Sequence, residues 1–304
     1  MTADLPEPAA LGGLADEQAR VARFRDRVGV PALIDAHTHF MPERLLNAVW
    51  RYFDSAGPLV GRPWPIRYRA EERARVDMLR GFGVRAFTSM LYPHKADMAR
   101  SLNDWAADFA SRTPGCVHTA TLFAEPSAPH DVKRAIGQGA RVFKVHLQVG
   151  DFDPNDPSLD DAWGVLAEAG VPVVTHCGSG PVPGRFTGPE PIAALLARHP
   201  SLRLVIAHLG MPEYSEFLDL AERYDRVLLD TTMALTSFVE ERAPFPRADV
   251  PRLEAFGDRV LLGTDFPNIP YAYADALEAP ENAGLSREWL RAVYHDNAAR
   301  LFGL

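Results

Sequence analysis

The chain has 304 residues, of which 47% are hydrophobic and 24% are charged, a composition typical of a globular protein with a substantial core. Its formal net charge of −8 argues against nucleic acid or an anionic membrane surface as a partner. Because two cysteines are too few for a disulfide framework, and neither a signal peptide nor a membrane-spanning apolar run is recognisable, we expect a cytoplasmic protein of one or two domains.

Residues 1–30 are rich in Ala, Glu and Arg, and we interpret them as an N-terminal extension with an amphipathic helix over 17–28. The first predicted strand, 33–37, leads into His37 and His39. Side chains on a strand alternate between its faces, so these two histidines lie on one side of the chain and could bind one metal ion together. The pair alone is also compatible with one histidine that caps the strand and another that is exposed.

A short helix over 42–50 and a loop over 55–69, rich in Pro, Gly, Arg and aromatic residues, come next. From residue 71 onward, helices alternate with strands that are nearly continuous runs of Val, Ile and Leu, which is typical of a parallel sheet buried on both faces. Eight strands in total, without a glycine-rich dinucleotide loop, predict an α/β protein with a single (β/α)8 TIM barrel over residues 31–304. The predicted helices are 71–80, 96–112, 129–138, 160–169, 190–197, 213–223 and 287–302, and the later strands are 84–91, 117–123, 141–147, 171–175, 203–207, 227–230 and 259–263.

Polar residues follow several of these strands, at the end of the barrel where active sites of this fold lie. His176 follows the fifth strand, His208 the sixth, and Asp265 comes shortly after the eighth. Together with His37 and His39 they place four histidines and one aspartate on one rim. A single histidine at a strand end is usually structural, but this combination indicates a metal site.

Six motifs occur in order along the chain: DAHTH (35–39), FKVH (143–146), TH (175–176), AHLG (207–210), GTDFP (263–267) and NAARLFGL (297–304). On these motifs the chain resembles the amidohydrolase superfamily, and within it the amidohydrolase-2 branch that includes aminocarboxymuconate-semialdehyde decarboxylase. The resemblance covers nearly everything from residue 33 to 304. It implies that His37, His39, His176 and Asp265 hold one divalent metal, usually zinc, with His208 beside it in a catalytic role.

The donor types of this site predict its chemistry. Neutral imidazoles leave much of the metal's charge uncompensated, so a water that it binds becomes hydroxide near neutral pH. Asp265 would act as general base and then general acid, while His208 polarises the substrate carbonyl. We therefore expect a metal-dependent hydrolase of an amide, lactone or ester. The alternative is a zinc-dependent non-oxidative decarboxylase of an aromatic or muconate-type carboxylate, because the resembling branch contains both activities.

Lys144 shares a strand face with His146 and has three interpretations. In binuclear members of the superfamily a lysine here is carbamylated and bridges two metals, whereas in the mononuclear branch it can offer the substrate a fixed positive charge. It could instead pair with a buried carboxylate such as Asp230. Tyr92 and Arg185, in loops at the predicted rim, complete the substrate-binding set with Lys144 and His146. We expect a small-molecule substrate that carries a carboxylate, and a homodimer by analogy with the resembling branch.

Overall fold

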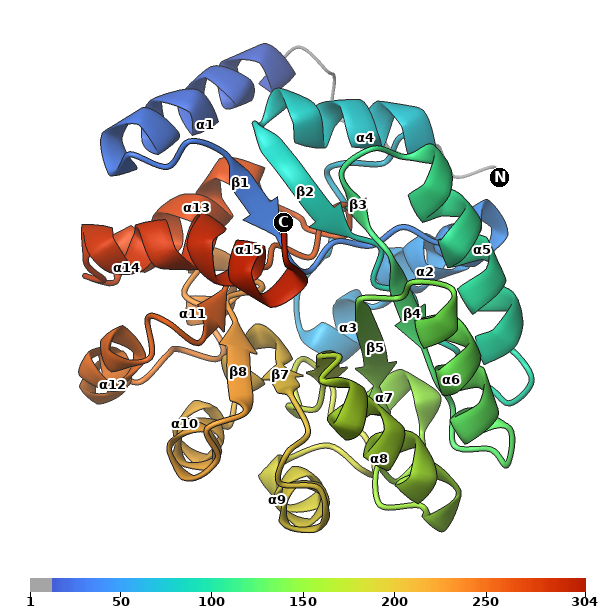
Figure 1. Cartoon of the computed structure of the whole chain (residues 1–304). Coiled ribbons are helices and arrows are strands. Elements are labelled where there is room, and N and C mark those ends of the chain that lie inside the picture. Colours follow the sequence, from blue (N-terminus) through green and yellow to red (C-terminus); the bar gives the residue numbers. More distant parts are fainter. Residues whose placement is uncertain (1–12) are drawn as a thin grey trace.

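In the computed structural model, which describes residues 13–304, nine short parallel strands form the wall of a (β/α)8 barrel and helices cover its outside (Figure 1). This is the predicted fold class. The first twelve residues of the predicted N-terminal extension lie outside the described part of the chain. The strands are β1 (Leu33–Asp35), β2 (Val84–Thr88), β3 (Cys116–Val117), β4 (Thr119–Thr121), β5 (Val142–His146), β6 (Val173–His176), β7 (Leu204–Ile206), β8 (Val227–Asp230) and β9 (Val260–Leu261).

The strands pair in chain order, β1 to β3 and β4 to β9, and backbone hydrogen bonds join these two groups into a ring. Ala36 N donates to Leu262 O at 2.8 Å, which connects the end of β1 to the end of β9. On the opposite side, Arg141 N donates to His118 O at 2.9 Å, next to β5. The first and last strands of the barrel are therefore neighbours.

The predicted strand 117–123 is divided into β3 and β4, because the ladder is interrupted at His118. Ser89 N donates to Thr119 Oγ1 at 3.0 Å, so a side-chain oxygen replaces a backbone carbonyl at this point. The His118 carbonyl turns instead toward β5. A threonine hydroxyl that competes with the backbone accounts for the break.

The predicted helix 287–302 is also divided, by a π turn over Ala292–Asp296. The Val293 carbonyl accepts a hydrogen bond from Leu262 N at 3.0 Å and so is bonded to the barrel wall at the end of β9. The predicted loop 55–69 contains one short helix. The helices are α1 (Leu14–Val28), α2 (Glu43–Ser55), α3 (Gly57–Val60), α4 (Glu72–Gly81), α5 (Ala99–Arg112), α6 (Ala128–Gly137), α7 (Leu147–Gly150), α8 (Asp160–Ala169), α9 (Pro189–Arg198), α10 (Tyr214–Arg223), α11 (Ser237–Glu240), α12 (Val250–Ala255), α13 (Tyr273–Asn282), α14 (Arg287–Arg291) and α15 (Asn297–Phe302).

The core has two layers, as both faces of the strands are buried. Inward-pointing side chains such as Ile34, Val174 and Leu261 fill the barrel, and a larger cluster lies between strands and helices. In that outer layer Trp163 of α8 is 1% exposed, and its indole N–H donates to Pro154 O at 2.9 Å. Apolar residues at both alternations of each strand explain the continuous hydrophobic runs of the sequence.

Helix α1 lies outside the βα repeats and packs beside α13 and α14 (Figure 1). Its apolar residues Val21, Phe24 and Val28 are almost completely buried. Arg20 forms a two-pronged ion pair with Glu278 of α13, at 2.7 and 2.9 Å. The N-terminal helix is thus attached to the last quarter of the chain.

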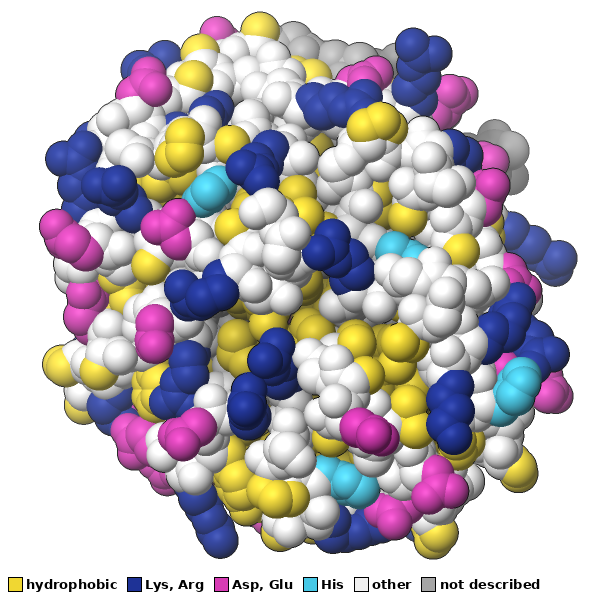
Figure 2. Space-filling model, viewed as in Figure 1, with side chains coloured by type: hydrophobic (Ala, Val, Ile, Leu, Met, Phe, Trp, Pro, Cys, Tyr) yellow, Lys and Arg dark blue, Asp and Glu magenta, His cyan; other side chains and the backbone are white. Residues whose placement is uncertain are grey.

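Figure 2 shows one face of the molecule in the same view. Lys and Arg side chains lie over the centre of this face, and Asp and Glu side chains are found mainly toward its rim. Many charged side chains form exposed pairs, such as Arg252 with Asp219 at 2.6 Å, which add little stability. Between residues 13 and 304, no helix has the length and apolar character needed to cross a membrane.

The packing of α1 can be tested with Phe24→Ala. We expect the free energy of unfolding to fall by about 3 to 5 kcal/mol, because a fully buried aromatic ring is removed. Urea denaturation measures this change. The exposed neighbour Arg23→Ala is the control, with an expected change within about 0.5 kcal/mol. Equal stability of both variants would show that α1 does not unfold with the barrel.

Candidate metal and substrate site

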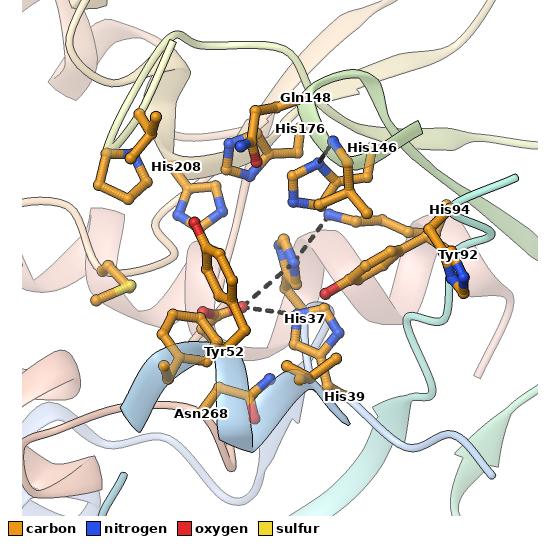
Figure 3. A pocket seen from close by; sticks show the side chains of 18 of the residues that line it. His37, His39, Tyr52, Tyr92, His94, His146, Gln148, His176, His208 and Asn268 are labelled. Atoms are coloured by element: carbon orange, nitrogen blue, oxygen red, sulfur yellow. Dashed lines mark hydrogen bonds and ion pairs between the residues drawn. The ribbon is translucent and has the colours of Figure 1, made fainter. Parts of the chain in front are cut away.

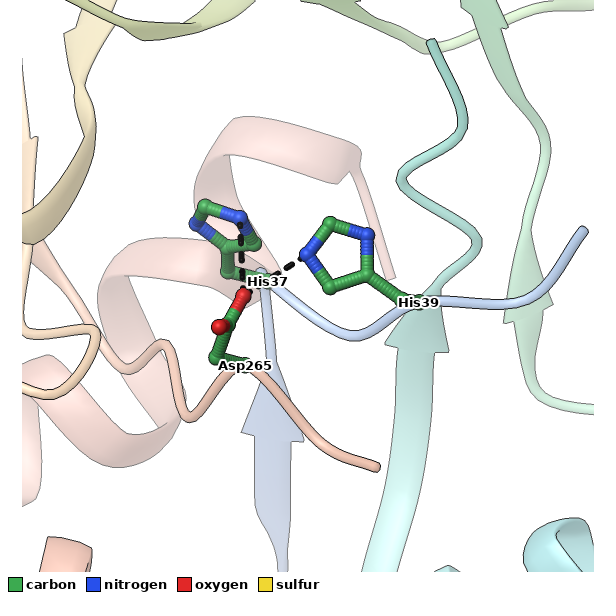
Figure 4. A group of neighbouring side chains, drawn as sticks. All are labelled: His37, His39 and Asp265. Carbon is green, nitrogen blue, oxygen red and sulfur yellow. Dashed lines mark hydrogen bonds and ion pairs between the residues drawn. The ribbon is translucent and has the colours of Figure 1, made fainter. Parts of the chain in front are cut away.

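Three polar side chains at the ends of β1 and β9 converge on one point of the barrel rim (Figure 4). One nitrogen or oxygen atom each of His37, His39 and Asp265 lies within 4.8 Å of the other two. Asp265 Oδ1 is 2.7 Å from His39 Nε2 and 3.7 Å from His37 Nε2, and all three residues are buried. The structure thus brings together three of the four predicted metal ligands.

The backbone between β9 and Asp265 is shaped for this approach. Asp265 has a φ of 70°, in the left-handed region that aspartate adopts more readily than most residues. Its N–H donates to His37 O at 2.9 Å. Gly263 is required nearby, because a Cβ there would lie 2.8 Å from His37 Cβ and 2.1 Å from Thr232 Oγ1. The GTD segment, residues 263–265, therefore packs closely against His37 at Gly263 and turns sharply at Asp265.

Two oxygen atoms fix the orientation of the imidazoles. His37 Nδ1 lies 2.8 Å from Asp230 Oδ2, and His39 Nδ1 is hydrogen-bonded to Met90 O. A carboxylate or carbonyl oxygen only accepts, so both Nδ1 atoms donate, and each Nε2 keeps its lone pair in the neutral ring. This arrangement is common around metal-binding histidines. His39 Nε2 and Asp265 Oδ1 are then two acceptors 2.7 Å apart, which need a shared proton or cation between them. The donor set fits a divalent metal such as zinc.

The fourth predicted ligand, His176, lies next to this group but outside it. Its Nε2 is 3.0 Å from Gly180 O, to which it donates. Its ring stacks on His146, with 4.0 Å between the ring centroids. Its role as a metal ligand stays a prediction.

His208 is held in an unusual backbone conformation, with a φ of 58°. Its N–H donates to Asp230 Oδ1 at 2.9 Å, so Asp230 positions both His37 and His208. The Nδ1 atom of His208 is buried without a hydrogen-bond partner. A buried nitrogen of this kind is available for a ligand atom or a substrate.

Burial and mutual interactions set the charges of the site. Burial lowers the pKa of His37 and the pKa of His208 to about 4, so both rings are neutral at pH 7. Burial alone would raise the pKa of Asp265, but its charge interaction and hydrogen bond with His39 hold that pKa below its ordinary value. The pKa of Asp230 is lowered against burial by His37 in the same way. At neutral pH Asp230 and Asp265 are therefore ionised and His37 and His208 are neutral, and these are the forms that favour a bound cation.

Lys144 on β5 is fully buried, and its Nζ lies 3.0 Å from His37 Nε2. The other nitrogen of the same ring contacts Asp230, so Lys144 and Asp230 are connected through His37. Burial lowers the pKa of Lys144 to about 8, partly opposed by the charges of Asp230 and Asp265. The amine therefore stays mostly protonated at neutral pH, but loses its proton more easily than an ordinary lysine. The three roles predicted for Lys144 stay predictions.

A cavity of about 480 Å³ opens over the three converging side chains. Figure 3 shows histidine rings around one end of it, with the Tyr92 hydroxyl pointing among them. Of the predicted substrate-binding residues, Tyr92, Lys144 and His146 line this cavity. Arg185 is exposed, stacks on Phe186 and is not among the described residues that line the cavity.

Tyr52 and Asn268 are among the lining residues that the sequence interpretation missed. On α2, Leu45, Val49 and Tyr52 recur at helical spacing and all face the cavity, a signal that could have been found. Asn268 Oδ1 accepts from the Trp50 indole at 3.0 Å. This contact joins α2 to the segment after β9 and has no signature in the sequence.

Comparison with known proteins gives one family and several structural relatives. A family model described as amidohydrolase matches residues 34–304, and no curated protein sequence matches the chain. An uncharacterized TIM-barrel protein from Bordetella bronchiseptica is 18% identical with a TM-score of 0.72, over 90% of this chain and 98% of that one. A putative 2-pyrone-4,6-dicarboxylic acid hydrolase from Pseudomonas putida is 22% identical with a TM-score of 0.59, over 90% and 98% of the two chains.

A third relative is the 5-carboxyvanillate decarboxylase from Novosphingobium aromaticivorans, solved with bound manganese and 3-methoxy-4-hydroxy-5-nitrobenzoic acid. It is 16% identical, with a TM-score of 0.59 over 91% of this chain and 98% of that one. At these identities the likenesses establish the fold, and they confirm the predicted barrel.

The orienting role of Asp230 predicts the effect of Asp230→Asn. We expect Zn²⁺ binding to weaken by about 10- to 100-fold, because His37 loses the carboxylate that fixes its orientation. Competition with a chromophoric chelator at pH 7 measures the affinity. Asp225→Asn, an exposed change on the preceding turn, should bind like the wild type. Unchanged affinity in Asp230→Asn would contradict this role.

The buried histidines predict that the metal-free chain loses stability as the pH falls from about 6.5 to 5. The folded-state pKa values of His37 and His208 are about 4, against 6.5 ordinarily, so in this window the unfolded chain binds more protons. Each group then lowers the unfolding free energy by about 1.4 kcal/mol per pH unit as the pH falls. Asp35 acts in the opposite direction. Burial raises its pKa to about 7, so in this window the folded chain keeps a proton on Asp35 that the unfolded chain releases.

Urea denaturation in the presence of a chelator, at several pH values, measures this slope. His208→Asn should make it shallower, because one of the buried histidines that cause the slope is removed; burial lowers the pKa of His146 and of His176 in the same direction. A stability that rises as the pH falls would show that Asp35 outweighs the histidines.

Proposed function

The chain belongs to the amidohydrolase family, and from that premise we propose that it is a metal-dependent hydrolase that cleaves an ester, lactone or amide bond in a small molecule. His37, His39 and Asp265 would hold one divalent metal, with Zn²⁺ as our first choice and His176 as a further candidate ligand. When bound, the metal supplies Lewis-acid polarisation and a lowered pKa for water. The observation that carries the proposal is the ionised Asp265 carboxylate beside two oriented imidazoles.

Two residues are assigned to proton transfer and carbonyl activation. Asp265 stays ionised at neutral pH because its pKa is low, so it can accept a proton from water and return it to the leaving group. His208 is neutral at this pH, and its Nδ1 has no protein partner. In the tautomer protonated at Nδ1, it donates a hydrogen bond to the substrate carbonyl as negative charge develops there.

The side chains that line the cavity favour a substrate with an apolar part about as large as one ring. Tyr52, Trp64 and Met233 are among the side chains around the cavity. Of the described residues that line the cavity, Lys144 is the only Lys or Arg, and it lies against His37 at the closed end. A single cation there suits a substrate with at most one carboxylate. A molecule with several carboxylates would lack partners for them.

The second candidate is non-oxidative decarboxylation, favoured by the position of Lys144. The cation at the closed end could hold a substrate carboxylate, and Asp265 or His208 could then deliver a proton to carbon. The decarboxylase from Novosphingobium aromaticivorans, solved with manganese and a nitrobenzoic acid, is a structural relative that supports this alternative. One site can serve both reactions, because each needs a bound carbonyl or carboxylate and a proton carrier.

Isotope transfer from solvent separates the two reactions on a panel of aryl esters, lactones and hydroxybenzoates. Hydrolysis places one ¹⁸O atom from labelled water in the new carboxyl group. Decarboxylation instead releases CO₂ and places one solvent deuterium on carbon in D₂O. Mass spectrometry detects either label, and we expect ¹⁸O incorporation. Deuterium on carbon with release of CO₂ would replace hydrolysis with the second candidate.

In the same assays, His208→Asn should lower kcat by about 10²- to 10⁴-fold with unchanged metal content, since a proton-transfer or carbonyl-polarising group is lost. His130→Asn is the matched control, because the His130 side chain is 70% exposed and lies on α6 outside the cavity. Full activity of His208→Asn would exclude the role assigned to His208.

A further inference from the structure

Helix α1 carries a buried carboxylate that fixes the start of α13. The side chain of Glu17 is only 4% exposed. Its Oε1 accepts hydrogen bonds from the Tyr68 hydroxyl and, at 2.6 Å, from Tyr273 N, while its Oε2 accepts from Arg67 at 3.1 Å. A carboxylate buried this deeply is stable only with such partners. Glu17 therefore accepts the first N–H of α13, together with the Tyr68 hydroxyl, which accepts from Tyr273 N at 2.6 Å.

Tyr273 connects this cluster to the first strand. Its ring stacks on Phe82, the residue that follows α4, with 4.7 Å between centroids and 8° between planes. Its hydroxyl donates to Asp35 Oδ2 at 2.9 Å. Both Tyr273 and Asp35 are completely buried.

Asp35 in turn holds the two segments that carry the metal-binding side chains. Its Oδ1 accepts from His37 N at 3.2 Å, and its Oδ2 accepts from Thr264 Oγ1 at 2.6 Å. Thr264 Oγ1 also accepts from Phe266 N at 3.2 Å, so the contacts of Thr264 bracket Asp265 on both sides. Asp265 has the left-handed backbone conformation that such contacts must maintain.

We propose that Glu17 and Tyr273 are positioning residues that set the metal affinity of the site. Glu17 fixes Tyr273, Tyr273 fixes Asp35, and Asp35 keeps His37 and Asp265 at the separation that binds one ion. The proposal rests on the metal-dependent function proposed above. None of Glu17, Tyr273 and Asp35 is among the described residues that line the cavity, so their effect passes through the backbone of the ligands.

A second buried tyrosine provides a matched control. Tyr294 is also completely buried, and its hydroxyl donates to Leu277 O at 2.6 Å. Leu277 lies on α13, away from the ligand-bearing segments. Tyr294→Phe therefore removes the same atom at the same depth, without a connection to Asp35.

The test compares Co²⁺ binding by the full-length wild type, Tyr273→Phe and Tyr294→Phe, after removal of resident metal. Isothermal titration gives the dissociation constant, and the visible absorption of bound Co²⁺ reports its coordination. We expect about tenfold weaker binding and an altered Co²⁺ spectrum in Tyr273→Phe, as for other residues that orient metal ligands. Tyr294→Phe should bind Co²⁺ like the wild type, even if its melting temperature falls as much as that of Tyr273→Phe.

Glu17→Gln provides an independent variant with no change at the site itself. It should weaken Co²⁺ binding in the same direction, and the double variant Glu17→Gln/Tyr273→Phe should lose less than the sum of the two single effects, because both act through Asp35. Wild-type affinity in Tyr273→Phe, or equal losses in Tyr273→Phe and Tyr294→Phe, would overturn the positioning role and leave the proposed function untouched. A wild-type chain that binds no divalent metal would overturn the proposed function together with it.

Discussion

The hydrogen bonds between the ends of β1 and β9 are the constraint on which the rest of the site depends. The Ala36 N–H donates to Leu262, and the Asp265 N–H donates to His37. Barrel closure and assembly of the His-His-Asp group are therefore one structural event, since the ligands come from the first and last strands. A fault in closure would separate the ligands by more than a metal ion can bridge.

Charge balance inside the barrel follows from this closure. Asp35, Asp230 and Asp265 are buried close together, where unpaired carboxylates would be strongly destabilising. Asp35 and Asp230 each accept several hydrogen bonds, and Asp265 faces two imidazoles. Lys144 adds one positive charge at the same depth. Hydrogen bonds, imidazoles and Lys144 thus stabilise the buried carboxylates, and a divalent cation would neutralise more of their negative charge.

Much of this arrangement could be predicted from the sequence, because strand ends of a (β/α)8 barrel meet at one rim whatever the chain distance between them. That rule alone brought His37, His39 and Asp265 together. Strand and helix ends were less predictable: Thr119 interrupts a strand through its hydroxyl, and a Val293 carbonyl bonded to the barrel wall interrupts a helix. Such contacts join residues distant in sequence, so no local pattern encodes them.

The attachment of α1 to α13 has a consequence for synthesis on the ribosome. Val21, Phe24 and Val28 leave the ribosome well before their partners in α13 and α14, which follow more than 240 residues later. At ordinary elongation rates this leaves an apolar helix face uncovered for a time on the order of tens of seconds. The nascent chain therefore exposes an apolar surface until α13 and α14 are made, and a chaperone that shields amphipathic helices would act during this interval.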